Sequence, residues 1–456
     1  MTRSKRSCCC TVVMLSAALC AGAAPAAETL PLVSSITHDD ITWSFATPVR
    51  AGRFVTGDPY VVSPATITAV FPAPTPGRNG SVLNPPLNSG VSGFDDRVSS
   101  NRFRAELRAA FPLDLKPGDA LISSISIDSI GSVRSWLRPS DTPASPVRSV
   151  SILTCLAAPA PTDAFRPSYG DSSRTLYRAA NLRRELLPRL APAGTVPDIA
   201  EFAEHFRRPW LDICFFSFDA AVEYQPAYGR EIGRAAGIAS LLLSLDIAAS
   251  EKEPLLLGFI QYGIDLWGLA QNGYPGWPAH GGHGSGRKWP IIFAGTMLGD
   301  SAMSVPTRHM PDLKFGEDMQ TMYDSSWTGA SVVYAGHQGV FQGQVVSATE
   351  GWGPYEHLPP QKWPSNLGEN YRRCCTSLSW IGQALAARLM GAVDSWNHPP
   401  FFDYCDRWMS EADSAHVAAI KKARDWDYSA QWSRQGQCWD KFVEAMWERY
   451  RHSDAN

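Results

Sequence analysis

A glycine-rich loop carries the residue types that proton-transfer chemistry needs. Residues 273–300 contain His280, His283, Arg287 and Lys288, and five glycines lie between positions 276 and 286. Glycine permits positive φ and close approach by a ligand, which a plain linker does not require. Histidine is the side chain most easily tuned to act as a base near neutral pH, and the adjacent cations can neutralise a substrate carboxylate. These groups suit β-elimination from a uronic acid, whose C5 proton becomes removable once its carboxylate is neutralised.

β-Elimination also needs an acid that returns a proton to the leaving oxygen, and a tyrosine commonly fills this role. Tyr371 is one candidate, because Arg372 and Arg373 follow it directly and can hold an acidic sugar. Tyr334 is another candidate. We therefore expect His283 or His280 to act as the base, with either tyrosine as the proton donor.

Carboxylates offer a competing chemistry. Glu317 and Asp318 are neighbours in the segment 315–324, and Asp300 stands at the predicted end of a helix that begins at Pro290. Two carboxyl groups that face each other across a cleft can act as acid and base in glycoside hydrolysis. An inverting glycoside hydrolase that uses Glu317 or Asp318 with Asp300 is therefore the alternative hypothesis. Asp300 is also a candidate for substrate binding.

The spacing of His280 and His283 suits two metal ligands on one turn. No third ligand is obvious nearby, and Arg287 with Lys288 would oppose a cation. We therefore expect a site without a catalytic metal and a protein without a cofactor, and leave a structural cation open.

Aromatic residues are abundant, with sixteen tryptophans and fourteen tyrosines. Flat aromatic faces suit sugar rings, but they suit protein cores as well. We assign most of the tryptophans to the core. Trp277 and Trp352 lie near polar loops, and we expect them to contact a sugar.

The overall charge gives little indication of a partner. The chain has 456 residues and a formal net charge of -3, without a strongly basic segment beyond its first residues. Nucleic-acid binders usually carry a basic surface, so we do not expect nucleic acid as a partner. No apolar run after the N-terminal region is long enough to span a bilayer, which predicts no integral membrane segment in the mature chain.

The N-terminus reads as a secretory signal peptide over residues 1–26. A basic start precedes a small apolar stretch, and positions 24–26 form an A-x-A cleavage site. We therefore expect a periplasmic or secreted protein, in which the remaining six cysteines can form disulfides, mainly within the C-terminal group. For the neighbouring Cys374 and Cys375 we expect one bridged and one buried cysteine.

The pattern of hydrophobic residues changes once along the chain. Residues 28–157 contain short alternating runs separated by turn residues, which predicts a β-sandwich. A proline-rich linker follows at 158–172. Residues 173–456 show helical periodicity, beginning with a basic amphipathic helix over 173–190, and predict an all-α domain of helical hairpins that carries the catalytic site.

This layout resembles secreted carbohydrate-active enzymes that join a β-sandwich to an α/α toroid, among them polysaccharide lyases. The resemblance concerns the order of the two halves and the His, Arg and Tyr residues on loops between helices. It implies a polysaccharide substrate. We therefore expect a lyase that cleaves a uronic-acid-containing glycan, with the inverting hydrolase and a non-catalytic glycan-binding protein as alternatives.

Overall fold

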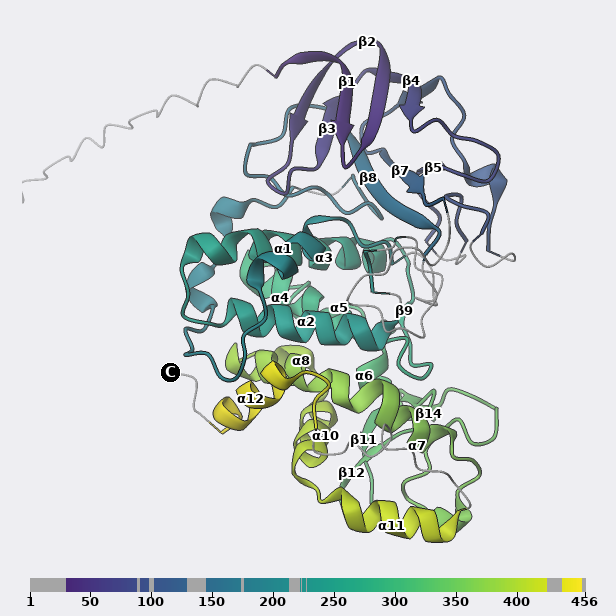
Figure 1. Ribbon diagram of the computed structural model, residues 1–456, viewed down its shortest axis with the longest axis vertical. Coiled ribbons are helices and arrows are strands. Elements are labelled where there is room, and N and C mark those ends of the chain that lie inside the picture. Colours follow the sequence, from purple (N-terminus) through teal and green to yellow (C-terminus); the bar gives the residue numbers. More distant parts are fainter. Residues whose placement is uncertain are drawn as a thin grey trace, which may run out of the picture.

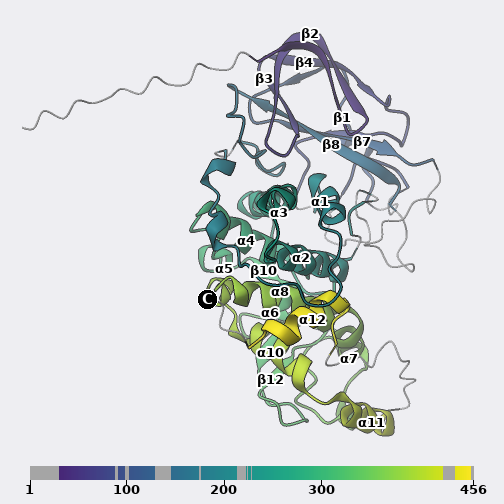
Figure 2. The ribbon, with the colours of Figure 1, turned by 60° about the vertical axis from the view of Figure 1, so that its left-hand side comes forward.

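The structure is a computed structural model that describes residues 30–87, 91–97, 102–128, 145–173, 176–212, 222, 224–226, 228–424 and 437–452. The predicted signal peptide lies outside these residues. Figures 1 and 2 both show a β-sheet at one end of the molecule, helices in successive layers beneath it, and α11 (Asp413–Ala423) at the opposite end.

One sheet of eight strands contains nearly all the regular structure of the N-terminal half. Its strands run in the order β5-β7-β8-β3-β2-β4-β6, and β1 pairs with β2 beside this path. The strands are β1 (Leu32–His38), β2 (Ile41–Arg53), β3 (Pro59–Val62), β4 (Ala65–Phe71), β5 (Ser81–Leu83), β6 (Leu113–Leu115), β7 (Ala120–Ser126) and β8 (Val147–Leu156). All pairs are antiparallel except β3 with β8.

The predicted β-sandwich is wrong, because within the described residues the strands form a curled half-barrel. The long strand β2 pairs with β1, β3 and β4, and its pairing with β1 and β4 shifts register along the way. Such irregularities bend a sheet. The interior of the curl is filled by apolar side chains, and the Trp43 Nε1–H donates to Ser123 Oγ on the facing strand β7 at 3.0 Å.

The central helices pack in layers below the sheet. α1 packs on α3, α3 on α4, and α2 on α8, while α8 also contacts α10 and α12. Their bounds are α1 (Ile199–Arg207), α2 (Gly229–Leu243), α3 (Ala249–Gln271), α4 (Lys288–Leu298), α8 (Ser377–Leu389), α10 (Pro399–Ser410) and α12 (Lys441–Tyr450). The sequence predicts helices over 197–206, 228–247, 251–271, 290–300, 376–391, 399–409 and 438–450, and these ranges agree with the seven helices.

The predicted all-α toroid is also wrong: the described residues form a mixed α/β fold, with 37% of them in helices and 21% in strands, and these helices form no clear toroid. Short strands interrupt the helical half: β9 (Gly276–Trp277), β10 (Lys314–Phe315), β11 (Thr321–Tyr323), β12 (Val332–Tyr334), β13 (Val340–Phe341) and β14 (Gln344–Val345). Several helices are single turns or little more: α5 (Pro306–His309), α6 (Gly316–Met319), α7 (Leu367–Tyr371) and α9 (Val393–Trp396). Between residues 176 and 190, where a helix was expected, two 3₁₀ turns occur.

Buried charges join the sheet to the helices. Arg166, which is 1% exposed, donates from Nε to Asp58 Oδ2 at 3.1 Å and from Nη2 to Asp265 Oδ2 at 2.6 Å. Asp58 precedes β3, and Asp265 lies in α3. The guanidinium group therefore forms an ion pair with one carboxylate from each half of the molecule.

None of the helices in the described ranges is long and apolar enough to cross a membrane.

Candidate active site

The glycine-rich loop connects β9 to α4 and is buried almost throughout. Among residues 279–290 only His280 is partly exposed. Gly281 has a φ of 59°, and a Cβ at this position would lie 2.4 Å from the Tyr371 ring. At Gly282 a Cβ would lie 2.2 Å from the Cys375 carbonyl oxygen. These glycines therefore allow the loop to approach the turn that carries Tyr371.

The loop brings three histidines together. The ring centroids of His280 and His283 are 5.6 Å apart, and those of His280 and His337 are 4.8 Å apart. His337 follows β12, and its carbonyl accepts the Gly281 backbone N–H at 3.0 Å. The sequence prediction missed His337. Gly336, which precedes His337, has a φ of 101°. A histidine next to a glycine was therefore the feature of the sequence that could have identified this residue.

Burial holds the three imidazoles in their neutral form. It lowers the pKa of His283 to about 3 and that of His337 to about 4, and a charge on His280 opposes protonation of both. His280 is the most exposed of the three, and burial lowers its pKa as well. A neutral imidazole can accept a proton, so His280 has both the protonation state and the accessibility of a general base.

Two partly exposed aromatic residues border the pair of His280 and His337. The Trp352 ring centroid lies 5.6 Å from that of His280 and 4.8 Å from that of His337. The Tyr371 ring lies 4.3 Å from the His337 ring. We call His280, His283, His337, Trp352 and Tyr371 the histidine cluster. Its partly exposed members are an imidazole, a phenol and an indole, which are a base, an acid and a flat apolar face.

Buried side chains outside the cluster fix its backbone. Gln320 Nε2 donates to the carbonyls of Gly281 and His337 at 2.8 and 2.9 Å. The Tyr228 hydroxyl accepts the Gly282 N–H at 2.7 Å, and its ring meets the His283 ring edge-on at 4.6 Å. Neither Gln320 nor Tyr228 was predicted, because both act through contacts that sequence spacing does not reveal.

The predicted loop cations point away from the exposed face of the cluster. Arg287 Nη2 donates to Asp212 Oδ1 at 2.8 Å, while Nη1 donates to the carbonyls of His283 and Ser285 at 2.6 and 2.8 Å. Lys288 pairs with Asp318. Arg287 is 1% and Lys288 0% exposed, so both charges are neutralised inside the protein.

The arginines after Tyr371 are also buried in ion pairs. Arg372 lies 3.2 Å from Glu356 and 3.5 Å from Glu369. Arg373 pairs with Glu369 and, at 2.6 Å, with Asp413. Both arginines follow Tyr371 in the sequence, but their charges are not presented to solvent.

Tyr334 and Trp277 lie in the core. Tyr334 is 0% exposed, and its hydroxyl accepts from Gln320 Nε2 at 2.9 Å. Trp277 is 3% exposed and stacks on Phe315 with ring centroids 5.8 Å apart. Of the two predicted proton donors, only Tyr371 reaches the exposed face of the cluster, and of the two predicted sugar platforms, only Trp352.

The structure does not bring Asp300 together with Glu317. Glu317 accepts the Gly286 N–H at 2.7 Å, just before α4, whereas Asp300 accepts the Tyr177 hydroxyl at 2.6 Å, just after α4. This helix of 11 residues is about 16 Å long at 1.5 Å per residue. Inverting glycosidases hold their carboxyl groups about 6.5–9.5 Å apart. The two ends of α4 exceed that separation.

Glu317 is a buried carboxyl that retains a proton up to neutral pH. Burial raises its pKa to about 7, although the Gly286 N–H opposes this shift. Glu317 Oε2 and the neighbouring Gln383 Oε1 have no hydrogen-bond partner among the described residues. A proton on the carboxyl gives this pair of acceptors the donor that it lacks.

Replacing Glu317 with glutamine is expected to remove a pH dependence of stability. The carboxyl titrates near 4.5 when unfolded and near 7 when folded, so the wild type loses unfolding free energy as the pH rises through this window. The loss is on the order of 3 kcal/mol and is complete above the folded pKa. Denaturant unfolding across this range tests the effect, and a parallel decline in wild type and Glu317→Gln would contradict it.

In the described part of the chain, no group of three or more His, Cys, Asp or Glu side chains is arranged to hold a metal ion. The three imidazoles of the histidine cluster do not form such a group. That the protein works without a cofactor stays a prediction.

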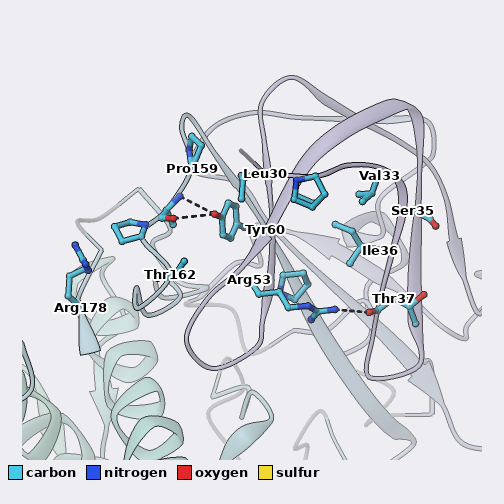
Figure 3. Close-up of a pocket in the computed structure, with 16 residues that line it drawn as sticks. Leu30, Val33, Ser35, Ile36, Thr37, Arg53, Tyr60, Pro159, Thr162 and Arg178 are labelled. Atoms are coloured by element: carbon cyan, nitrogen blue, oxygen red, sulfur yellow. Dashed lines mark hydrogen bonds between the residues drawn. The ribbon is translucent and has the colours of Figure 1, made fainter. Parts of the chain in front are cut away.

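A groove of about 880 Å³ lies in the β half and shares no residue with the histidine cluster. Figure 3 shows its wall of β1 and β2 residues facing the segment 159–162. The Ala160 N–H donates to the Tyr60 hydroxyl at 3.1 Å, and Arg53 donates to the Thr37 carbonyl at 3.3 Å. Among the described residues that line the groove there is no histidine or carboxylate to act as a general base.

No protein-family model, curated protein or solved structure matches this chain. The assignment of a function therefore depends on the chemistry of the histidine cluster.

Proposed function

We propose that the protein is a periplasmic or secreted polysaccharide lyase that cleaves a uronic-acid-containing glycan by β-elimination. One observation carries the proposal: His280, Tyr371 and Trp352 are partly exposed and meet around His337. A base, an acid and an aromatic platform for a sugar ring are thus contributed by three separate segments. The support comes from these residues and not from the toroid resemblance, because the helices form no clear toroid.

The proposed reaction needs two proton transfers. His280 removes the proton from C5 of the uronic acid, and the electron pair forms the C4–C5 double bond as the C4–O4 bond breaks. The Tyr371 hydroxyl donates its proton to O4 of the departing chain. Transfer of the proton from His280 back to Tyr371, directly or through solvent, restores the enzyme. Trp352 holds the sugar by contact with its apolar face.

The buried ion pairs indicate which form of the substrate suits the site. A free carboxylate makes the C5 proton hard to remove unless a cation neutralises it, and Arg287, Lys288, Arg372 and Arg373 are all paired inside the protein. An esterified carboxyl group carries no charge and needs no such cation. We therefore expect the esterified form of a uronic-acid glycan to be the better substrate.

A panel of polysaccharides tests the proposal. We expect new absorbance in the unsaturated-uronate band with esterified uronic-acid glycans, less with the corresponding free acids, and none with neutral glycans. New reducing ends without that absorbance would identify a hydrolase, and retention without cleavage would identify a binding protein. Either result would overturn the lyase proposal.

A further inference from the structure

Cys374 and Cys375 form a disulfide with each other, and Cys374 lies three residues after Tyr371. The sequence prediction of one bridged and one buried cysteine is therefore replaced by a bond between neighbours. The disulfide lies in a π-helical turn, Arg372–Thr376, between α7 and α8. Such turns are rare and often occur at functional sites. Within it, the Thr376 hydroxyl donates to the Tyr371 carbonyl at 3.0 Å.

The same turn contacts the glycine-rich loop. Gly282 packs directly on the Cys375 carbonyl, so the backbone of the turn forms a wall for the loop. On the other side, Arg230 Nη1 donates to the Cys374 carbonyl at 3.2 Å, and the guanidinium carbon lies 4.0 Å above the Trp439 ring. The disulfide turn, which follows Tyr371 directly, is therefore in contact with the loop that carries His280.

We infer that the Cys374–Cys375 disulfide is a positioning element that holds Tyr371 against the His280 loop, so that the site is assembled only in an oxidising compartment. A bond between adjacent cysteines closes a small ring that restricts the backbone of both residues. Without this ring the turn is free to adopt ordinary helical geometry, which rotates Tyr371 relative to Gly281. Its effect on turnover rests on the proposed function.

Reduction is a balanced exchange that a dithiol can carry out. One thiolate of the dithiol attacks Cys374, which is partly exposed, and Cys375 leaves as a thiolate. The second thiol of the reagent then attacks the mixed disulfide, forms a cyclic disulfide and releases Cys374. Two electrons and two protons pass to the cysteine pair. The other cysteines within the described ranges, Cys155, Cys405 and Cys438, are free thiols buried in the protein.

The test compares the wild type with the Cys374→Ser/Cys375→Ser double variant, each with and without dithiothreitol. Trypsin cleaves after Arg373 and Arg388, so the mass of peptide 374–388 reports the redox state of this pair directly. We expect reduction to lower kcat roughly 10- to 100-fold with little change in KM, because a small displacement of a reacting group is costly. The double variant should match the reduced wild type and ignore the reagent. Unchanged kcat with a fully reduced peptide would overturn the inference.

Histidine ring resonances give a readout that does not depend on turnover. On reduction, the NMR signals of His280 and His337 should shift, while those of the exposed residue His357 stay in place. If they shift in a protein that cleaves no glycan, the proposed function fails and the positioning role stands. If no signal moves on complete reduction, the positioning role is wrong whatever the activity.

Discussion

Replacing His280 with glutamine is expected to lower kcat/KM on an esterified uronic-acid glycan by about 10²- to 10⁴-fold, the usual contribution of a general base. Glutamine keeps a polar side chain of similar size but cannot accept the C5 proton. Because His280 is partly exposed in a loop whose backbone is held by Gln320, the fold should tolerate the change. Steady-state kinetics, with circular dichroism as a check on folding, measure the effect.

The pH dependence of kcat/KM for the wild type is an independent test of the role of His280. Burial lowers the pKa of His280 below its ordinary value of 6.5, so the base stays neutral in mildly acidic solution. The acid limb of kcat/KM should therefore fall below pH 6.5, and His280→Gln should lose this limb. The exposed residue His357, changed to glutamine, serves as the matched control and should leave kcat/KM unchanged. Equal activities of the two variants would remove His280 from the catalytic role.

The sequence allowed prediction of the loop but not of its partners. His280 and Tyr371 were candidates because glycines and basic residues surround them, and both lie in the histidine cluster. Charge pairing was beyond prediction: Arg287 is paired with Asp212, which is 75 residues away along the chain. A cation next to a histidine in sequence can serve a substrate or a buried carboxylate, and only the fold decides between these.

The fold was predictable at the level of elements and not at the level of their assembly. Alternation predicts strands at 41–45, 60–62, 66–70, 120–127 and 150–153, which correspond to β2, β3, β4, β7 and β8. The pattern reports only that one face of each strand is buried. Two packed sheets and one curled sheet satisfy that pattern equally. The strand that produces one curled sheet and not two packed sheets is β2, whose 13 residues pair with three strands and bend between them.

The helical half shows the same limit. Periodicity located α2, α3, α8 and α10, but helices that are buried over most of their surface can pack in many arrangements. Between residues 176 and 190, two of the basic residues that suggest a solvated helix face bind distant carboxylates: Arg178 pairs with Asp163 and Arg184 with Glu253. In this segment the Arg183 N–H donates to the Met297 carbonyl at 2.9 Å and not to the carbonyl four residues earlier, so a tertiary contact takes the place of a helix hydrogen bond.

Replacing Arg166 with methionine is expected to lower the free energy of unfolding by about 3–5 kcal/mol, because it leaves the carboxylates of Asp58 and Asp265 buried without a counter-ion. Both carboxylates are nearly inaccessible, at 2% and 1% exposed. Arg178→Met is the matched control: its side chain is 42% exposed, and loss of its ion pair with Asp163 should cost less than about 1 kcal/mol.

Denaturant unfolding can separate two causes of this destabilisation, which are the unpaired carboxylate charges and the lost contacts of the arginine side chain. Adding Asp58→Asn and Asp265→Asn to Arg166→Met removes the two carboxylate charges that Arg166→Met leaves unpaired. This triple variant should therefore regain part of the stability that the single variant loses. Recovery would show that the unpaired carboxylate charges, and not the missing guanidinium contacts, destabilise the packing of the sheet on α3. If Arg166→Met and Arg178→Met were equally stable, the buried ion cluster would not be what joins the two halves.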